Sequence, residues 1–140
     1  MERKHIVWTA EKSNRLYDFL AEKEYAQSDF FGYQVKEAIF NIVKQFVDIT
    51  ENINYLDYGC GGGYIIQYFL ENANSVKVYG TDMSPSCVML CNDKLKNYEN
   101  FKGVKKFDGN SLPFSDNFFH VITATEVVEH LLPEHRGGIF

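Results

Sequence analysis

The sequence predicts an α/β protein, a Rossmann-like parallel sheet with helices on both faces. Three observations predict this fold. From residue 51 onward, apolar runs of strand length alternate with amphipathic runs of helix length. The apolar runs are hydrophobic on both faces, as in strands covered by helices. A glycine-rich turn follows the first strand, where an open α/β sheet places its ligand site.

Two helices are expected before the sheet. Residues 11–27 and 33–49 show helical periodicity, and in the second segment apolar residues recur at three- and four-residue steps. We therefore divide the chain into a helical cover, residues 1–50, and a ligand-binding half of the sheet domain, residues 51–140.

Within residues 51–140 the order of elements is strand, helix, strand, helix, strand, strand. The strands are expected over 53–58, 76–82, 101–108 and 118–126, and the helices over 64–73 and 84–98. Ser84 is the expected N-cap of the second helix, with Pro85 at its first position. Too few residues follow the fourth strand for the rest of a doubly wound sheet, so we expect only its N-terminal half. The fourth strand would then form an edge that allows self-association.

Composition excludes several classes of protein. The net charge is -5 with no long Lys/Arg run, which argues against non-specific binding to nucleic acid or anionic membranes. The chain has no apolar stretch of about 20 residues and no signal peptide, which predicts a cytoplasmic location. The three cysteines form no C-x-x-C pair, so neither a disulfide framework nor a zinc site is expected.

The glycine turn at residues 59–63 predicts a nucleoside site. Gly59, Gly61 and Gly63 permit positive φ and let a ligand approach the backbone at the start of the next helix. Asp82 ends the second strand about 20 residues later, where a carboxylate can accept hydrogen bonds from both ribose hydroxyls. The structural alternatives are a tight turn without a ligand and an Asp82 that only caps the following helix.

Two residues indicate which nucleoside fits. Tyr64 stands where a dinucleotide fingerprint needs its third glycine. Asp57 precedes the turn, where a carboxylate would repel a pyrophosphate and attract an ammonium or sulfonium group. Both residues disfavour a nicotinamide dinucleotide, so an oxidoreductase is only an outside alternative.

Four segments together resemble class I S-adenosylmethionine-dependent methyltransferases, most closely the small-molecule branch that includes quinone-biosynthesis enzymes. They are "LDYGCGGG", "VYGTDMSP", "FDGNSLPFSDNFFHVI" and "TATEVVEHL", in family order and spacing over residues 51–133. Helical segments before the first strand also cover the cofactor in many members of that family.

The resemblance implies S-adenosylmethionine as cofactor and S-adenosylhomocysteine as product, and it assigns residues to each part of the ligand. Asp82 would bind the ribose, Met83 would pack on adenine, and Asp108 would accept from the adenine amino group. The methionine part would lie in the glycine turn and near the fourth strand. The remaining implied contacts are Asp57, Gly59, Cys60, Gly61 and Gly63 in the turn, Gly109 and Asn110 beside Asp108, and Thr125 after the fourth strand.

The stretch after the fourth strand holds the candidate catalytic residues, Glu126 and His130. Methyl transfer mainly needs alignment in a dry pocket, and a base helps only when the acceptor must lose a proton. If this stretch is helical, Glu126, Glu129 and His130 share one face and could bind Mg²⁺ or Mn²⁺. The pattern resembles that of metal-using 2'-O-methyltransferases of small RNAs and of some quinone-pathway enzymes. We favour the metal-free reading, in which Glu129 and His130 hydrogen-bond around the loop.

The leading hypothesis is S-adenosylmethionine-dependent methyl transfer to a small molecule, with the acceptor atom (O, N or C) left open. We expect residues 1–140 alone to have little or no activity. One alternative is a metal-dependent RNA 2'-O-methyltransferase, which the acidic charge disfavours. The other is a non-catalytic, truncated fragment.

Overall fold

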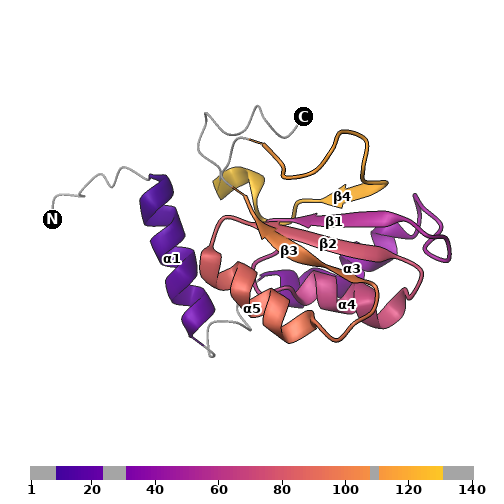
Figure 1. The fold of residues 1–140 in the computed structure, drawn as a ribbon, viewed down its shortest axis with the longest axis horizontal. Coiled ribbons are helices and arrows are strands. Elements are labelled where there is room, and N and C mark those ends of the chain that lie inside the picture. Colours follow the sequence, from indigo (N-terminus) through magenta and orange to yellow (C-terminus); the bar gives the residue numbers. More distant parts are fainter. Residues whose placement is uncertain (1–8, 24–30, 108–110, 131–140) are drawn as a thin grey trace, which may run out of the picture.

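The computed structural model describes residues 9–23, 31–107 and 111–130, and Figure 1 shows their arrangement. The predicted helices and strands are all present in the predicted order. Two helices, α1 (Ala10–Glu22) and α3 (Phe31–Val43), precede the sheet. The remaining elements are β1 (Asn54–Tyr58), α4 (Tyr64–Asn72), β2 (Lys77–Asp82), α5 (Pro85–Leu95), β3 (Phe101–Lys106), β4 (Val121–Thr123) and the 3₁₀ turn η1 (Val128–His130).

The four strands form one parallel sheet in the order β3-β2-β1-β4, which confirms the predicted fold class. The chain runs outward from β1 through β2 to β3, and then returns to pair β4 with the other side of β1 (Figure 1). Strand order therefore reverses between β1 and β4. The carboxyl ends of these two strands are where a sheet of this kind binds its ligand.

One face of the sheet is covered by α3, α4 and α5 (Figure 1). On this face Tyr55 of β1 stacks on Phe69 of α4 with ring centroids 4.0 Å apart. Phe40 of α3 packs on the same Phe69 ring at 4.9 Å. Burial of these apolar faces is the main force that holds the helices on the strands.

The opposite face carries a loop instead of a helix in the described residues. Tyr79 of β2 points to this face and contacts three aromatic rings of the segment between β3 and β4, at centroid distances of 5.3 to 5.8 Å. These rings are Phe114, Phe118 and Phe119. The helices expected on both faces are thus seen on one. The "LPFSDN" run, which contains Phe114, carries turn residues and does not form a helix.

The first helix, α1, packs against α5 and lies apart from α3 and α4 (Figure 1). Ser84 caps α5 as predicted, because its Oγ accepts a hydrogen bond from Cys87 N at 3.1 Å and Pro85 opens the helix. No helix in the described ranges has the length and apolar character needed to span a bilayer.

Candidate functional site

The glycine turn connects β1 to α4 with positive φ at Gly59, Gly61 and Gly63, as the sequence predicts. The backbone N–H groups of Gly59 and Cys60 donate to the carbonyl oxygen of Thr81, at 2.8 and 3.0 Å. These bonds tie the turn to the end of β2. A Cβ at Gly59 would lie 2.4 Å from Val127 Cγ2, and one at Gly63 would lie 2.8 Å from Cys91 Sγ. At these two positions, therefore, the side chains of Val127 and Cys91 occupy the space that a Cβ would need.

Asp82 lies at the carboxyl end of β2 and bridges the turn to the next helix. Its Oδ2 accepts from Gly61 N at 2.8 Å, and its Oδ1 accepts from Ser84 N at 2.9 Å. Burial raises the pKa of this carboxyl, and the backbone hydrogen bonds partly oppose the rise. Asp82 thus caps the start of α5 and also supports the turn, and each oxygen keeps a lone pair for a further donor.

Three buried polar atoms at the ends of β1 and β2 have no hydrogen-bond partner in the described part of the chain. They are Asp57 Oδ2, Tyr58 Oη and Thr81 Oγ1. Burial, and then the charge of Asp82, raise the pKa of Tyr58 to about 12. Unsatisfied buried polar groups are rare in native proteins, and their gathering beside a glycine turn is typical of a ligand site.

The first helix reaches this site through Asp18, a residue that sequence reasoning did not assign. Ser84 Oγ donates to Asp18 Oδ1 at 2.6 Å, and Ser86 N donates to the same atom at 3.4 Å. Burial, followed by the charges of Asp82 and Glu129, raises the pKa of the neighbouring Tyr17. The side chains of α1 that are buried or partly buried include Ser13, Tyr17 and Ala21. Their four-residue spacing is the sequence signal that marks this face.

Met83 and Val127 join a small apolar cluster at the carboxyl end of the sheet. Tyr58 and Phe107 form its centre with ring centroids 5.1 Å apart, and Met83, Val127 and Leu112 pack against them. This cluster brings the ends of β1, β2, β3 and β4 together. Met83 therefore lies at the carboxyl end of the sheet, and its contact with adenine stays a prediction of the resemblance.

The stretch after β4 is not the helix on which the metal hypothesis depends. Glu126 has φ of 55° and precedes the 3₁₀ turn η1, which begins only at Val128. Glu126 and Glu129 therefore do not share a helical face. Within the described residues, no group of three His, Cys, Asp or Glu side chains could hold a metal ion. The side chain of His130 lies outside the described part.

Three of the predicted contacts, Asp108, Gly109 and Asn110, also lie outside the described residues. Thr125 is partly buried and follows β4, two residues beyond the last strand position at Thr123. The structure thus brings Asp57, the glycine turn, Asp82, Met83 and Thr125 to one end of the sheet.

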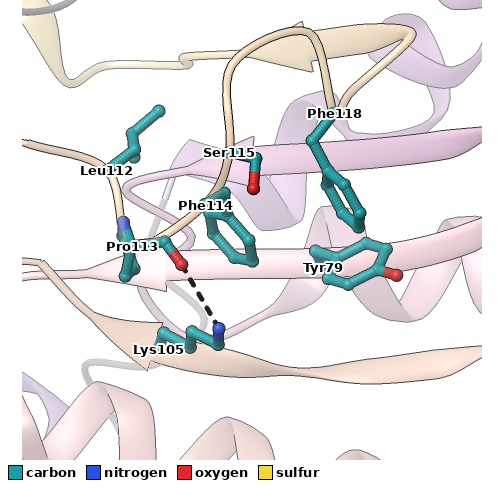
Figure 2. Close-up of a pocket in the computed structure, with 7 residues that line it drawn as sticks. All are labelled: Tyr79, Lys105, Leu112, Pro113, Phe114, Ser115 and Phe118. Carbon is teal, nitrogen blue, oxygen red and sulfur yellow. Dashed lines mark hydrogen bonds between the residues drawn. The ribbon is translucent and has the colours of Figure 1, made fainter.

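A separate, open hollow of about 520 Å³ lies on the opposite face of the sheet, over Tyr79 (Figure 2). Lys105 lies 4.6 Å from the Phe114 ring centroid, and its Nζ donates to the Pro113 carbonyl at 3.3 Å. These contacts hold the loop of residues 112–118 on the sheet. None of the predicted site residues lines this hollow.

The site can be compared with those of known proteins. A profile of the methyltransferase domain matches residues 56–139, which include the glycine turn and all the assigned residues. The chain belongs to the methyltransferase-domain family. It is also 30% identical over 86 residues to the mitochondrial ubiquinone biosynthesis O-methyltransferase of Saccharomyces cerevisiae, an alignment that covers 61% of this chain and 27% of the yeast protein. The predicted membership of the S-adenosylmethionine-dependent methyltransferases is thereby confirmed.

Solved structures show the same fold at low sequence identity. A methyltransferase from Haloferax volcanii, in complex with the activator Trm112, matches with a TM-score of 0.68 and 18% identity, over 86% of this chain and 51% of the other. PKMT2 from Rickettsia typhi, in complex with AdoHcy, matches with a TM-score of 0.57 and 24% identity, over 64% of this chain and 18% of the other. The 140 residues thus span about a quarter of the yeast protein and about half of the Haloferax chain.

Proposed function

We propose that residues 1–140 form the cofactor-binding part of a methyltransferase that transfers a methyl group from S-adenosylmethionine to a small-molecule acceptor. The observation that carries the proposal is the set of unpartnered buried atoms, Asp57 Oδ2, Tyr58 Oη and Thr81 Oγ1, beside the glycine turn and Asp82. The family match and the AdoHcy bound to a protein of similar fold support the same ligand.

The described residues fit the parts of this cofactor. The carboxylate of Asp57 suits the ammonium group of the amino-acid end, and Asp82 suits the ribose hydroxyls, which would use its remaining lone pairs. Met83 and the apolar cluster around Tyr58 offer a surface for adenine. We propose the further contacts of Cys60 and Thr125 with the cofactor, and of Asp108, Gly109 and Asn110, on the family resemblance.

When bound, the cofactor supplies a sulfonium methyl group that is open to in-line attack by a nucleophile. The protein has to hold the donor and exclude water so that the acceptor approaches at the right angle. Two backbone N–H groups hold the carboxylate of Asp82 in one orientation, which supports this role. Glu126 or His130 would take the proton of an acceptor hydroxyl or amine, if the acceptor carries one.

Ligand-induced thermal stabilisation tests the cofactor. S-adenosylhomocysteine at about 100 times its dissociation constant stabilises a protein by about 2.7 kcal/mol, so a clear rise in Tm is expected. NADH at the same concentration should give none, because Tyr64 and Asp57 disfavour a dinucleotide. A rise in Tm with NADH alone would overturn the proposal.

Substitution of Asp82 tests the site itself. Asp82→Ala should weaken S-adenosylhomocysteine binding by about 1.5–3 kcal/mol, measured by titration calorimetry, because it removes a charged hydrogen-bond acceptor. Asp93→Ala is the matched control, since Asp93 is an exposed carboxylate on α5 that pairs with Lys96 at 2.6 Å. Equal affinities of Asp82→Ala and the unaltered chain would show that Asp82 is only a structural cap.

The acceptor is open to experiment. We expect the 140-residue chain alone to show little or no turnover, and measurable turnover would contradict this expectation. An RNA 2'-O-methyltransferase would need a metal site that includes residues beyond the described part, and Mn²⁺ titration of the chain followed by calorimetry tests it. The cytoplasmic location and self-association through the β4 edge stay predictions.

A further inference from the structure

A chain of hydrogen bonds between two neighbouring strands ends on Asp57. Tyr55 Oη lies 2.6 Å from Thr123 Oγ1, and Thr123 Oγ1 lies 3.2 Å from Asp57 Oδ1. Tyr55 and Asp57 belong to β1, and Thr123 is the register partner of Asp57 on β4. The three side chains thus lie on the helix-covered face of the sheet, where strand order reverses.

The direction of each hydrogen bond in this chain is fixed when Asp57 is ionised. An ionised carboxylate only accepts hydrogen bonds, so Thr123 must donate its single hydroxyl hydrogen to Asp57 Oδ1. Thr123 Oγ1 can then only accept, and Tyr55 must be its donor. Both hydroxyl groups therefore point their hydrogens toward the carboxylate, and each bond strengthens the next.

The other oxygen of Asp57 is left for a partner that the described residues do not supply. Asp57 is 2% exposed, and its Oδ2 has no hydrogen-bond partner among them. An unpaired carboxylate oxygen in such a place is costly unless a donor, above all a cationic one, reaches it.

We propose that Tyr55 and Thr123 are positioning residues, which hydrogen-bond the ionised form of Asp57 at Oδ1 and direct its Oδ2 to the ammonium group of the cofactor's amino-acid end. The proposal rests on the proposed function and extends it to two residues outside the glycine turn. Tyr55 lies outside the four segments that carry the family resemblance, and Thr123 is the first residue of the last of them.

The surroundings of Asp57 favour a cationic ligand over a neutral one. Burial raises the pKa of Asp57 to about 7, the hydrogen bond from Thr123 lowers it, and the charge of Asp82 on β2 raises it further. The other titratable groups around this carboxyl are Tyr55 on β1 and Cys60 in the turn. All of these are neutral or acidic. A bound ammonium group would supply the missing positive charge and favour the ionised form.

Thr123→Val tests the proposal because valine keeps the shape of threonine and removes the donor to Asp57. Two ligands are titrated by calorimetry from pH 6 to 9. They are S-adenosylhomocysteine and 5'-methylthioadenosine, which lacks the amino-acid end. We expect Thr123→Val to weaken S-adenosylhomocysteine binding about tenfold or more at pH 7. The affinity for S-adenosylhomocysteine should rise with pH in both proteins, but at a higher pH in Thr123→Val. Binding of 5'-methylthioadenosine should change less than about twofold.

Two further variants complete the test. Thr123→Ser keeps the hydroxyl and should restore both affinity and pH profile, whereas Tyr55→Phe should give a smaller shift in the same direction. An equal loss of affinity for both ligands would show that Thr123 only joins β4 to β1, and would overturn the proposal. So would an unchanged affinity for S-adenosylhomocysteine with an unchanged pH profile.

Failure of the proposed function gives a different result. If the unaltered chain binds neither ligand, the cofactor assignment falls, and ¹³C NMR titration of Asp57 decides the role of Thr123. A higher titration midpoint in Thr123→Val upholds the positioning role, and an unchanged midpoint overturns it.

Discussion

The carboxyl ends of β1 and β2 differ sharply from the carboxyl end of β4. At β1 and β2, three successive N–H groups of the turn, from Gly59 to Gly61, are bonded to Thr81 and Asp82. At β4 the strand is three residues long, Ile122 is 51% exposed, and Glu126 has a left-handed backbone. Backbone hydrogen bonds hold the first region together, whereas the second has a short strand with a half-exposed side chain.

The difference indicates a division of labour in the proposed enzyme. Under the proposed function, the cofactor site is built from a short turn and two strand ends that hold each other. The residues after β4, which would face the acceptor, follow a short strand that is partly exposed. Function in such folds changes most where loops leave a rigid sheet.

The largest expected contrast in stability is between the helix layer that packs on β1 and the strand β4. Phe69→Ala should lower the free energy of unfolding by about 3–5 kcal/mol, because Phe69 is fully buried between Tyr55 and Phe40. Ile122→Ala on β4 should lower it by less than about 1 kcal/mol, since half of that side chain is exposed. Urea unfolding followed by circular dichroism measures both. Losses of similar size would mean that the β4 region is as tightly packed as the first.

A second test measures the energetic coupling between the two regions, at the contact of Gly59 with Val127. Gly59→Ala should lower the free energy of unfolding by about 2–4 kcal/mol, from its left-handed backbone and from overlap with Val127 after β4. Adding Val127→Ala should recover part of the overlap and leave about 1–2 kcal/mol from the backbone. A double-mutant cycle on unfolding free energies measures this coupling. Strictly additive losses would show that Val127 moves away without strain.

Counted per pH unit, the smallest of the three effects is the pH dependence that Asp57 gives to the first region. Because its pKa rises from 3.8 to about 7 on folding, the folded chain keeps a proton there that the unfolded chain releases. This contribution to stability is full below pH 4 and is lost as the pH rises to about 7. Relative to Asp57→Asn, the unaltered chain should lose up to about 1.4 kcal/mol per pH unit in that window.

Urea midpoints of both proteins at pH 4 to 8 measure this slope. The raised pKa of Asp82 acts in the same direction in both proteins, so the difference between them measures Asp57 together with its coupling to Asp82. Parallel stability curves would show that Asp57 titrates in the folded chain as it does in the unfolded one.

The features predicted well from the sequence are local ones. Strand and helix periods, the Ser84 cap and the positive φ of the turn glycines each depend on a few consecutive residues. The sequence left two roles open for Asp82, ribose ligand and helix cap. In the structure both of its oxygens accept hydrogen bonds from backbone N–H groups. One role did not exclude the other, because a carboxylate has lone pairs for both.

Contacts between distant segments could not be predicted. The bond of Thr123 to Asp57 joins residues 66 apart and depends on the register of β4, which one sequence does not determine. The link from Asp18 to Ser84 depends on where α1 docks. The face that Glu126, Glu129 and His130 would share depended on a helix, and the chain instead turns at Glu126 before η1 begins.

The glycine turn can be followed in solution through a buried thiol. The side chain of Cys91 packs where Gly63 has no Cβ, next to the thiol of Cys60. Cys91 Sγ donates to the Gly61 carbonyl at 3.2 Å, and both Cys60 and Cys91 are buried. The neighbouring Cys91 and burial hold the pKa of the Cys60 thiol well above its usual range, so that thiol stays protonated and unreactive in the closed turn. The rate at which the Cys60 thiol is alkylated therefore reports how often the turn opens. A ligand that closes the turn would slow this reaction, so a thiol reagent can follow site opening without a substrate.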